Sequence, residues 1–195
     1  MSTPLTPEQE HTVDAIAAHY SEILRLLGEN PDREGLLKTP IRAARAMYRA
    51  TRGYDLDGGE IIRRAIFTHE GSQMVIVKDI EFYSLCEHHI LPFFGHVSIG
   101  YIPDGKIVGL SKLARLVNVY ARRLQVQERM TAQICRDLQE HLSPKGVIAV
   151  CTAQHLCMKM RGVEKQDSVT TTMDTTGVFS DDRALRDEFF AALAR

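Results

Sequence analysis

The residue pattern changes near position 66, and this change constrains the fold more than any other feature of the chain. Before it, Thr6-Pro7-Glu8-Gln9 has the residues of a capped helix start, and apolar residues recur at helical spacing from Val13 to Leu27. After it, segments rich in β-branched and aromatic residues alternate with helical ones. The expected organisation is a helical segment over 1–65, followed by an α+β domain over 66–195.

The predicted order after residue 66 is strand, strand, helix, helix, strand, strand. Turn residues at Pro103–Lys106 predict that the second strand continues into a hairpin through Val108. This order favours an antiparallel sheet with its helices on one face. The strands are expected at 74–82, 95–102, 147–160 and 168–178, and the helices from Ser111, over 126–142 and from about Asp181.

The composition excludes several classes of function. The 195 residues include 24 Lys and Arg against 25 Asp and Glu, whereas a dedicated nucleic-acid binder needs clustered excess positive charge. No apolar run approaches the roughly 18 residues of a membrane span. The N-terminus has neither a basic nor an apolar signal region, so we expect a cytoplasmic protein whose four cysteines are reduced thiols, metal ligands or catalytic groups.

Two separated segments carry the residues of a metal site. Cys86 and His89 stand three apart after a predicted strand, where a tight turn can bring them to one ion. His155 and Cys157 stand two apart in another predicted strand, and residues two apart in a strand point to the same face. Two thiolates with one or two imidazoles favour Zn²⁺, and three protein ligands plus water would mark a catalytic site.

Simpler interpretations remain open at this point. His88 or His155 could complete a closed structural zinc site, and Cys157 could be a small buried apolar residue. Cys135 and Cys151 have no metal-like neighbours in sequence, so we expect both in the core.

Basic residues gather on three segments. A helical stripe of arginines (Arg42, Arg45, Arg49, Arg52) is either a solvated face or part of an anion site. The helix start at Ser111 offers free backbone N–H groups beside Lys112 and Arg115, and a second cationic group follows the third strand (Lys159, Arg161, Lys165). Local cations in a neutral chain fit a nucleoside triphosphate, but the sequence has neither a P-loop nor a G-x-G-x-x-G motif.

Gln127 and Glu128 stand together at a predicted helix start. A carboxylate beside a carboxamide can bind the N–H edge and carbonyl of guanine. An exposed first helical turn explains Glu128 equally well, because an acidic residue there is favoured by the helix dipole.

At these residues the chain resembles the type I GTP cyclohydrolase family. The resemblance covers about residues 35–193 in order. Its motifs are S-L-C-E-H-H (84–89), L-P-F-F-G (91–95), Y-I-P (101–103), G-L-S-K-L-A-R (109–115), Q-V-Q-E-R (125–129), H-L-C-M-K-M-R-G-V (155–163) and S-V-T-T-T (168–172). The chain departs from the family pattern at 151–154 and 171–177, away from the residues expected to bind metal.

The resemblance implies specific roles for individual residues. Cys86, His89 and Cys157 are expected to bind Zn²⁺. Three residues are expected to serve catalysis: His155 as acid/base, His88 beside the metal and Ser111. The remaining residues are expected to bind substrate: Glu128 and Gln127 at guanine, Lys112, Arg115 and Arg161 at the triphosphate, and Arg42 supplied by a neighbouring subunit.

The resemblance also implies the reaction and the assembly. GTP would lose C8 as formate and rearrange to 7,8-dihydroneopterin triphosphate, the first step of folate-type pterin biosynthesis. The expected fold is the tunnelling fold in a homodecamer with sites between subunits. Two rivals stay open: a binding module with a closed zinc site, and a tunnelling-fold enzyme acting on another pterin or a deazapurine.

Overall fold

The computed structural model describes residues 4–194, which form two compact units that divide between Thr51 and Arg52. The boundary predicted at residue 65 separates the purely helical part of the chain from the strand-bearing part. Residues 52–65 belong to the larger compact unit, because α3 (Gly58–Arg63) packs on the two long helices of that unit.

The N-terminal unit consists of two packed helices, α1 (Pro7–Leu26) and α2 (Thr39–Ala50). Thr6 caps α1 as predicted, since its side chain accepts a hydrogen bond from the Gln9 N–H and the Gln9 side chain accepts one from the Thr6 N–H. Arg45 on α2 pairs with Glu10 on α1 at 3.2 Å. One member of the arginine stripe therefore has a structural partner.

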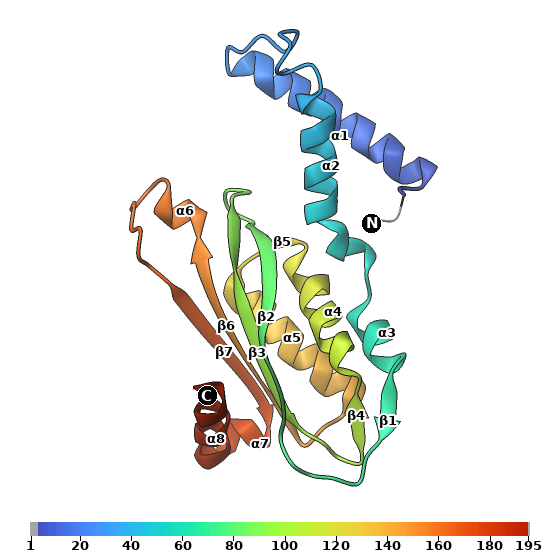
Figure 1. Ribbon diagram of the computed structural model, residues 1–195, viewed down its shortest axis with the longest axis vertical. Coiled ribbons are helices and arrows are strands. Elements are labelled where there is room, and N and C mark those ends of the chain that lie inside the picture. The colour runs from blue at the N-terminus through green and yellow to red at the C-terminus, as the bar shows by residue number, and fades with distance from the viewer. Residues whose placement is uncertain (1–3, 195) are drawn as a thin grey trace. The chain divides into compact units, whose positions relative to one another are not determined.

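The larger unit combines two sheets with short and long helices (Figure 1). Its strands are β1 (Ile66–Thr68), β2 (Val75–Cys86), β3 (Pro92–Ile102), β4 (Lys106–Val108), β5 (Leu124–Gln125), β6 (Gly146–His155) and β7 (Thr170–Gly177). Its other helices are the 3₁₀ turn η1 (Arg52–Asp55), α4 (Leu110–Ala121), α5 (Gln127–Leu142), α6 (Leu156–Lys159), α7 (Val178–Asp181) and α8 (Arg183–Leu193).

The main sheet has the strand order β5-β2-β3-β6-β7. Strands β2, β3, β6 and β7 pair antiparallel, which confirms the predicted α+β class and its four-stranded antiparallel sheet. The sheet also has a two-residue edge strand, β5, which pairs in parallel with Leu85 and Cys86 at the end of β2. This short pairing holds the start of α5 beside Cys86 at the end of β2.

Two local predictions were wrong. The residues after the 103–106 turn do not extend a hairpin with β3, because β3 is already hydrogen-bonded to β2 and β6 on its two sides; β4 pairs with β1 instead. The following helix does not begin at Ser111 either. Gly109 is the N-cap residue of α4, which places Ser111 within the first helical turn.

The core lies between the sheet and the paired helices α4 and α5. Leu113, Leu116 and Val117 of α4 are fully buried, as their helical spacing predicts, against inward-facing residues of the strands such as Phe82 and Val97. Met130, Ile134 and Leu138 of α5 complete this layer. Helices α4 and α5 therefore cover one face of the sheet, as the tunnelling fold requires.

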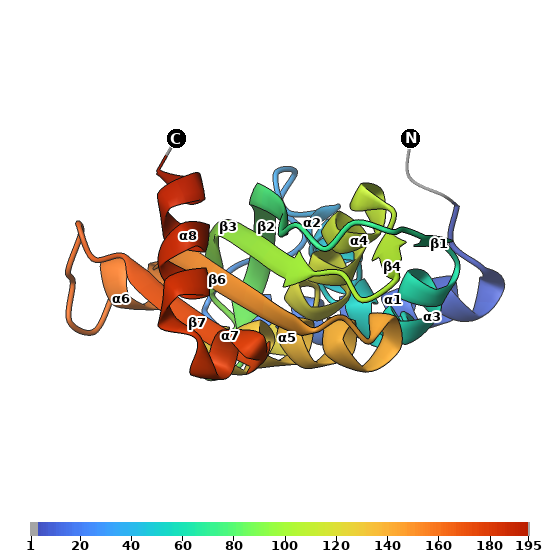
Figure 2. The ribbon, with the colours of Figure 1, turned by 90° about the horizontal axis from the view of Figure 1, so that it is seen from below.

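The opposite face of the sheet is covered at one end only. Phe179 of α7 and Phe189 of α8 pack on outward-facing residues of β3 and β6, including Ile148 and Val150. Figure 2 shows α7 and α8 against β6 and β7, away from α4. At the other end of this face His96 and Thr152 are exposed.

Candidate metal centre

The hairpin between β2 and β3 positions two of the predicted metal ligands. Cys86 is the last residue of β2, and its backbone closes the turn from both sides: its N–H donates to the Leu91 carbonyl at 2.9 Å, and its carbonyl accepts from the Ile90 N–H at 2.8 Å. Ile90 has a φ of 55°, which is unfavourable for a β-branched residue. The turn is thus tight enough to bring His89 back over Cys86.

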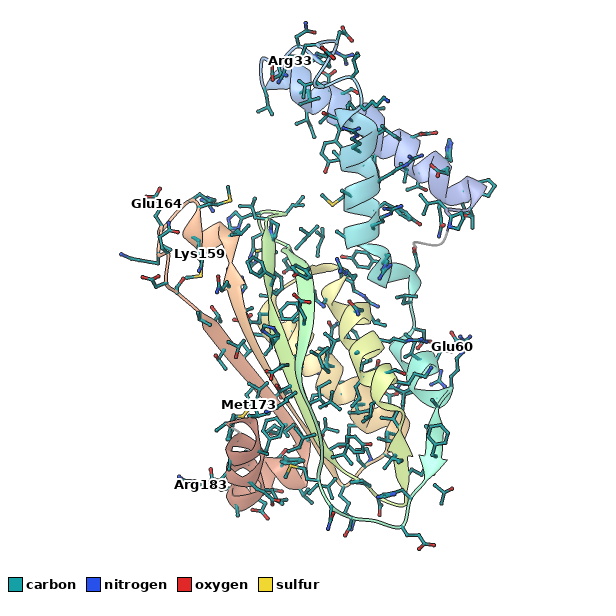
Figure 3. The ribbon with its side chains drawn as sticks, viewed as in Figure 1. Arg33, Glu60, Lys159, Glu164, Met173 and Arg183 are labelled. Atoms are coloured by element: carbon teal, nitrogen blue, oxygen red, sulfur yellow. The ribbon has the colours of Figure 1, made fainter. Side chains whose placement is uncertain are left out.

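Cys157 reaches the same place from a different element than predicted. Strand β6 ends at His155, where its pairing with β3 also ends, and the chain turns into the short helix α6, which carries Cys157. His155 and Cys157 therefore do not alternate along one strand. Helix α6 contacts β3, and Figure 3 labels its last residue, Lys159.

Cys86, His89 and Cys157 form a group of potential metal ligands. One donor atom from each lies within 4.8 Å of the other two, and the Cys86 Sγ is 3.9 Å from the His89 Nδ1. Tetrahedral zinc with ordinary bond lengths would set a sulfur and a nitrogen ligand about 3.5 Å apart. Two thiols and an imidazole at this separation fit Zn²⁺ and leave the fourth tetrahedral position for another ligand.

His155 lies near this group but is held by other contacts. Its Nε2 is 2.7 Å from the Oε1 of Gln127, and its ring stacks on Phe93 with 4.7 Å between centroids and 3° between planes. Burial lowers the pKa of His155, and the Glu128 carboxylate opposes part of that shift. Among residues 4–194, the clustered ligand atoms come from the other three residues and not from His155.

Gln127 and Glu128 begin α5 but differ in exposure. Gln127 is 1% exposed and hydrogen-bonded at both ends of its amide, whereas Glu128 in the same turn is exposed. Arg129, the next residue, pairs with Glu87 of the hairpin. The start of α5 is thereby fixed to both the sheet and the hairpin.

His88 and Arg161 also lie at the metal-binding end. The Nδ1 of His88 is 3.8 Å from the Cys86 Sγ, and its side chain is exposed. An Nη1 of Arg161 lies 2.8 Å from the Nε2 of His89. The structure therefore places one predicted triphosphate ligand directly beside a predicted metal ligand.

Ser111, Lys112 and Arg115 lie elsewhere in the same chain. All three are in the first half of α4, which follows β4, whereas the end of α4 leads to β5 beside Cys86 (Figure 1). The helix rises about 15 Å between Ser111 and its end at Ala121. One chain therefore does not bring these residues to its own metal ligands. Arg42 is an exposed residue of α2 in the N-terminal unit.

Phe93 is a residue of the site that the sequence did not single out. Its position opposite His155 comes from the β3–β6 register, which pairs these two residues directly. The motif L-P-F-F-G contains Phe93, but its two adjacent phenylalanines do not show which ring faces the site. Strand register was the missing information.

Cys135 and Cys151 are core residues, as predicted. Both are fully buried, and burial raises the pKa of each thiol to about 12. Because the thiolate is the reactive form, only on the order of one in ten thousand of these groups is reactive at pH 8.

We expect alkylation to separate the four cysteines. In the zinc-loaded protein at pH 8, iodoacetamide should modify none of them. After chelation it should modify Cys157, which is half-buried, and then Cys86, while Cys135 and Cys151 react only on denaturation. Peptide mass spectrometry checks the order. Labelling of Cys135 or Cys151 in the folded protein would contradict the described core.

Fold and site together define an α+β protein with a candidate zinc centre of two cysteines and one histidine at the end of an antiparallel sheet. The family model described as GTP cyclohydrolase I matches residues 16–194, and the chain belongs to this family. The family predicted from the sequence motifs is thereby confirmed.

Curated relatives match over nearly the whole chain. GTP cyclohydrolase 1 of Porphyromonas gingivalis is 56% identical over 188 residues, which cover 96% of this chain and 97% of the relative. The protein of the same name from Bacteroides fragilis is 59% identical and covers 88% of both chains. That of Rattus norvegicus is 51% identical over 95% of this chain and 77% of the relative. Among the described residues, no helix is long and apolar enough to span a membrane.

Proposed function

We propose that this protein is a zinc-dependent GTP cyclohydrolase I. It opens the imidazole ring of the guanine in GTP, releases C8 as formate and rearranges the remainder to 7,8-dihydroneopterin triphosphate. The observation that carries the proposal is the Cys86–His89–Cys157 group with His155 held beside it by other contacts. Membership of the family supports it.

Cys86, His89 and Cys157 would hold the zinc ion. Bound there, zinc would supply Lewis-acid chemistry that activates water for the hydrolysis. The β2–β3 hairpin and α6 provide these ligands, so the site forms only when β2, β3 and β6 are correctly paired. His88, exposed beside Cys86, contacts the substrate near the reacting carbon.

His155 moves the protons of the ring opening. A proton placed on N7 of guanine makes C8 electrophilic, and imidazole is suited to giving and regaining that proton near neutral pH. The stacked Phe93 and the hydrogen bond to Gln127 hold the ring in one orientation. Fixed orientation lowers the entropic cost of the proton transfer.

The start of α5 anchors guanine. Glu128 is exposed in the first turn, and its carboxylate accepts hydrogen bonds from the N1–H and the 2-amino group of the base. Gln127 belongs to the same segment. This anchoring sets C8 at the metal centre and uses binding energy remote from the reacting atoms.

Cations from more than one subunit bind the triphosphate. Arg161 lies beside His89 in the same chain. Ser111, Lys112 and Arg115 sit at the distant end of α4, so a neighbouring copy supplies them, and Arg42 also comes from a neighbour. The assembly is a homodecamer in the cytoplasm, with GTP as substrate and neither nucleic acid nor membrane as partner.

The sheet edges support assembly. Along Val75–Ser84, β2 has no strand partner on its outer side among residues 4–194, and neither does β7 on its outer side. Met173 of β7 is 50% exposed (Figure 3). Unpaired edges of this length favour pairing with another copy of the chain.

Incubation with GTP tests the proposed function. The purified, zinc-loaded protein should release formate and form a product with pterin absorbance, and a strong chelator should abolish both. Zinc added back in excess should restore them. Absence of formate from an assembled protein carrying one zinc per chain would overturn the proposed activity.

A further inference from the structure

Only one of the two possible orientations of the Gln127 side-chain amide satisfies its hydrogen bonds. Its Nε2 lies 3.0 Å from the Cys151 carbonyl, 3.1 Å from the Thr170 carbonyl and 3.2 Å from the Thr172 Oγ1. Two of these partners are backbone carbonyls, which only accept hydrogen bonds. A flipped amide would set its own carbonyl oxygen against them, so Oε1 must be the atom that faces His155.

This orientation determines which nitrogen of His155 carries the proton. Oε1 of Gln127 only accepts, so the His155 Nε2 at 2.7 Å must donate and therefore bears hydrogen. In the neutral imidazole the other nitrogen, Nδ1, is then an unprotonated acceptor. When the ring takes up a second proton, Nδ1 holds it, and that proton is the one His155 gives to N7 of guanine. Within residues 4–194, Nδ1 has no hydrogen-bond partner. A flipped ring would still stack on Phe93, but it would set a carbon instead of Nε2 against the Oε1 of Gln127 and lose that hydrogen bond.

The polar network behind Gln127 joins α5 to β7. The Oγ1 atoms of Thr131 and Thr172 are 2.7 Å apart, and the Thr131 hydroxyl donates to the backbone carbonyl of Gln127 at 2.8 Å. Gln127 is therefore held from α5 and from β7. With 1% exposure, the Gln127 side chain offers no exposed group to a base.

We propose that Gln127 is a positioning residue: its side chain holds His155 as the Nε2–H tautomer with Nδ1 presented to the substrate, and it does not itself contact guanine. The proposal rests on the proposed role of His155. Within the Gln127–Glu128 pair, the exposed Glu128 carboxylate is then the group that binds the base, and Gln127 acts only through the histidine.

A double-mutant cycle tests this role. Gln127→Met keeps the side-chain length but removes the hydrogen bonds; it should lower kcat about 10- to 100-fold, the range known for residues that orient a ligand or base. KM for GTP and zinc content should stay within about twofold. In a His155→Ala background the same substitution should change the residual rate little, because its effect passes through His155.

The matched control is Gln139→Met. Gln139 lies on the same helix and also bonds a β7 threonine, since its Oε1 accepts from Thr176 at 2.8 Å, but it lies near the other end of α5. It should cost comparable stability and leave kcat unchanged. Thr172→Val removes one partner of Gln127 without touching His155, and it should lower kcat with unchanged KM even if Gln127→Met does not fold.

Two outcomes would overturn the proposal. One is a loss of GTP affinity in Gln127→Met that persists in the His155→Ala background, which would make Gln127 a substrate contact. The other is ¹⁵N-histidine NMR showing that neutral His155 in the resting protein carries its proton on Nδ1 and none on Nε2, with the signal assigned by its absence in His155→Ala. The NMR result needs no turnover, so it separates failure of this inference from failure of the proposed activity.

Discussion

Replacing His155 with alanine is expected to leave one zinc per chain and to lower kcat about 10²- to 10⁴-fold, the usual contribution of a general acid/base. That loss corresponds to about 3 to 5 kcal/mol of activation free energy. Zinc should remain because the three clustered ligand atoms come from other residues. Metal analysis and formate release on the same preparation measure both quantities.

His96→Ala is the matched control for this substitution. His96 lies on β3, in the same sheet, but its side chain is exposed at the uncovered end of the other face. Neither zinc content nor kcat should change. Loss of zinc together with activity in His155→Ala would instead make His155 a fourth ligand, and the closed-zinc binding module would then be the better interpretation.

The sequence predicted the architecture well because the packing pattern is local. Leu113, Leu116 and Val117 repeat at helical spacing, and α4 buries all three. The β4 pairing was wrong because it depends on which strand edges are free, and that is decided by β6, about 40 residues further along the chain. The local residue pattern determines whether a segment forms a helix or a strand, whereas the pairing of a strand depends on the whole sheet.

The site shows the same division between local and long-range information. The residue types and the Cys86–His89 spacing indicate zinc from the sequence alone. The helical turn that carries Cys157 was missed, because four residues are too few to show a period. The bond between Gln127 and His155 joins residues 28 apart in sequence, and only the packing of α5 against β6 brings them together.

The distant position of Ser111, Lys112 and Arg115 has a consequence for catalysis. If a neighbouring copy supplies them, a dissociated chain retains its zinc ligands and His155 but lacks most of its triphosphate-binding cations. Zinc binding and turnover are then separable properties: the first belongs to one folded chain, and the second to the assembly.

Removing a metal ligand should have the largest effect of all. Cys86→Ala deletes a thiolate from a three-ligand set, and the two remaining ligands, His89 and Cys157, cannot hold zinc against a moderate chelator. We expect zinc to fall from one per chain to near zero and formate release to fall below detection. Metal analysis after gel filtration, followed by the formate assay, measures the two effects.

Cys135→Ala is the control, because it removes a thiol of the same type from the same unit. The Cys135 Sγ contacts the carbonyls of Val147 and Asp174 in the core, so its loss should cost about 1 kcal/mol of unfolding free energy but no zinc. Full zinc content in Cys86→Ala would contradict the assigned centre. Full activity without zinc would contradict the proposed chemistry, because His155 and Glu128 alone offer no group that activates water for attack on C8.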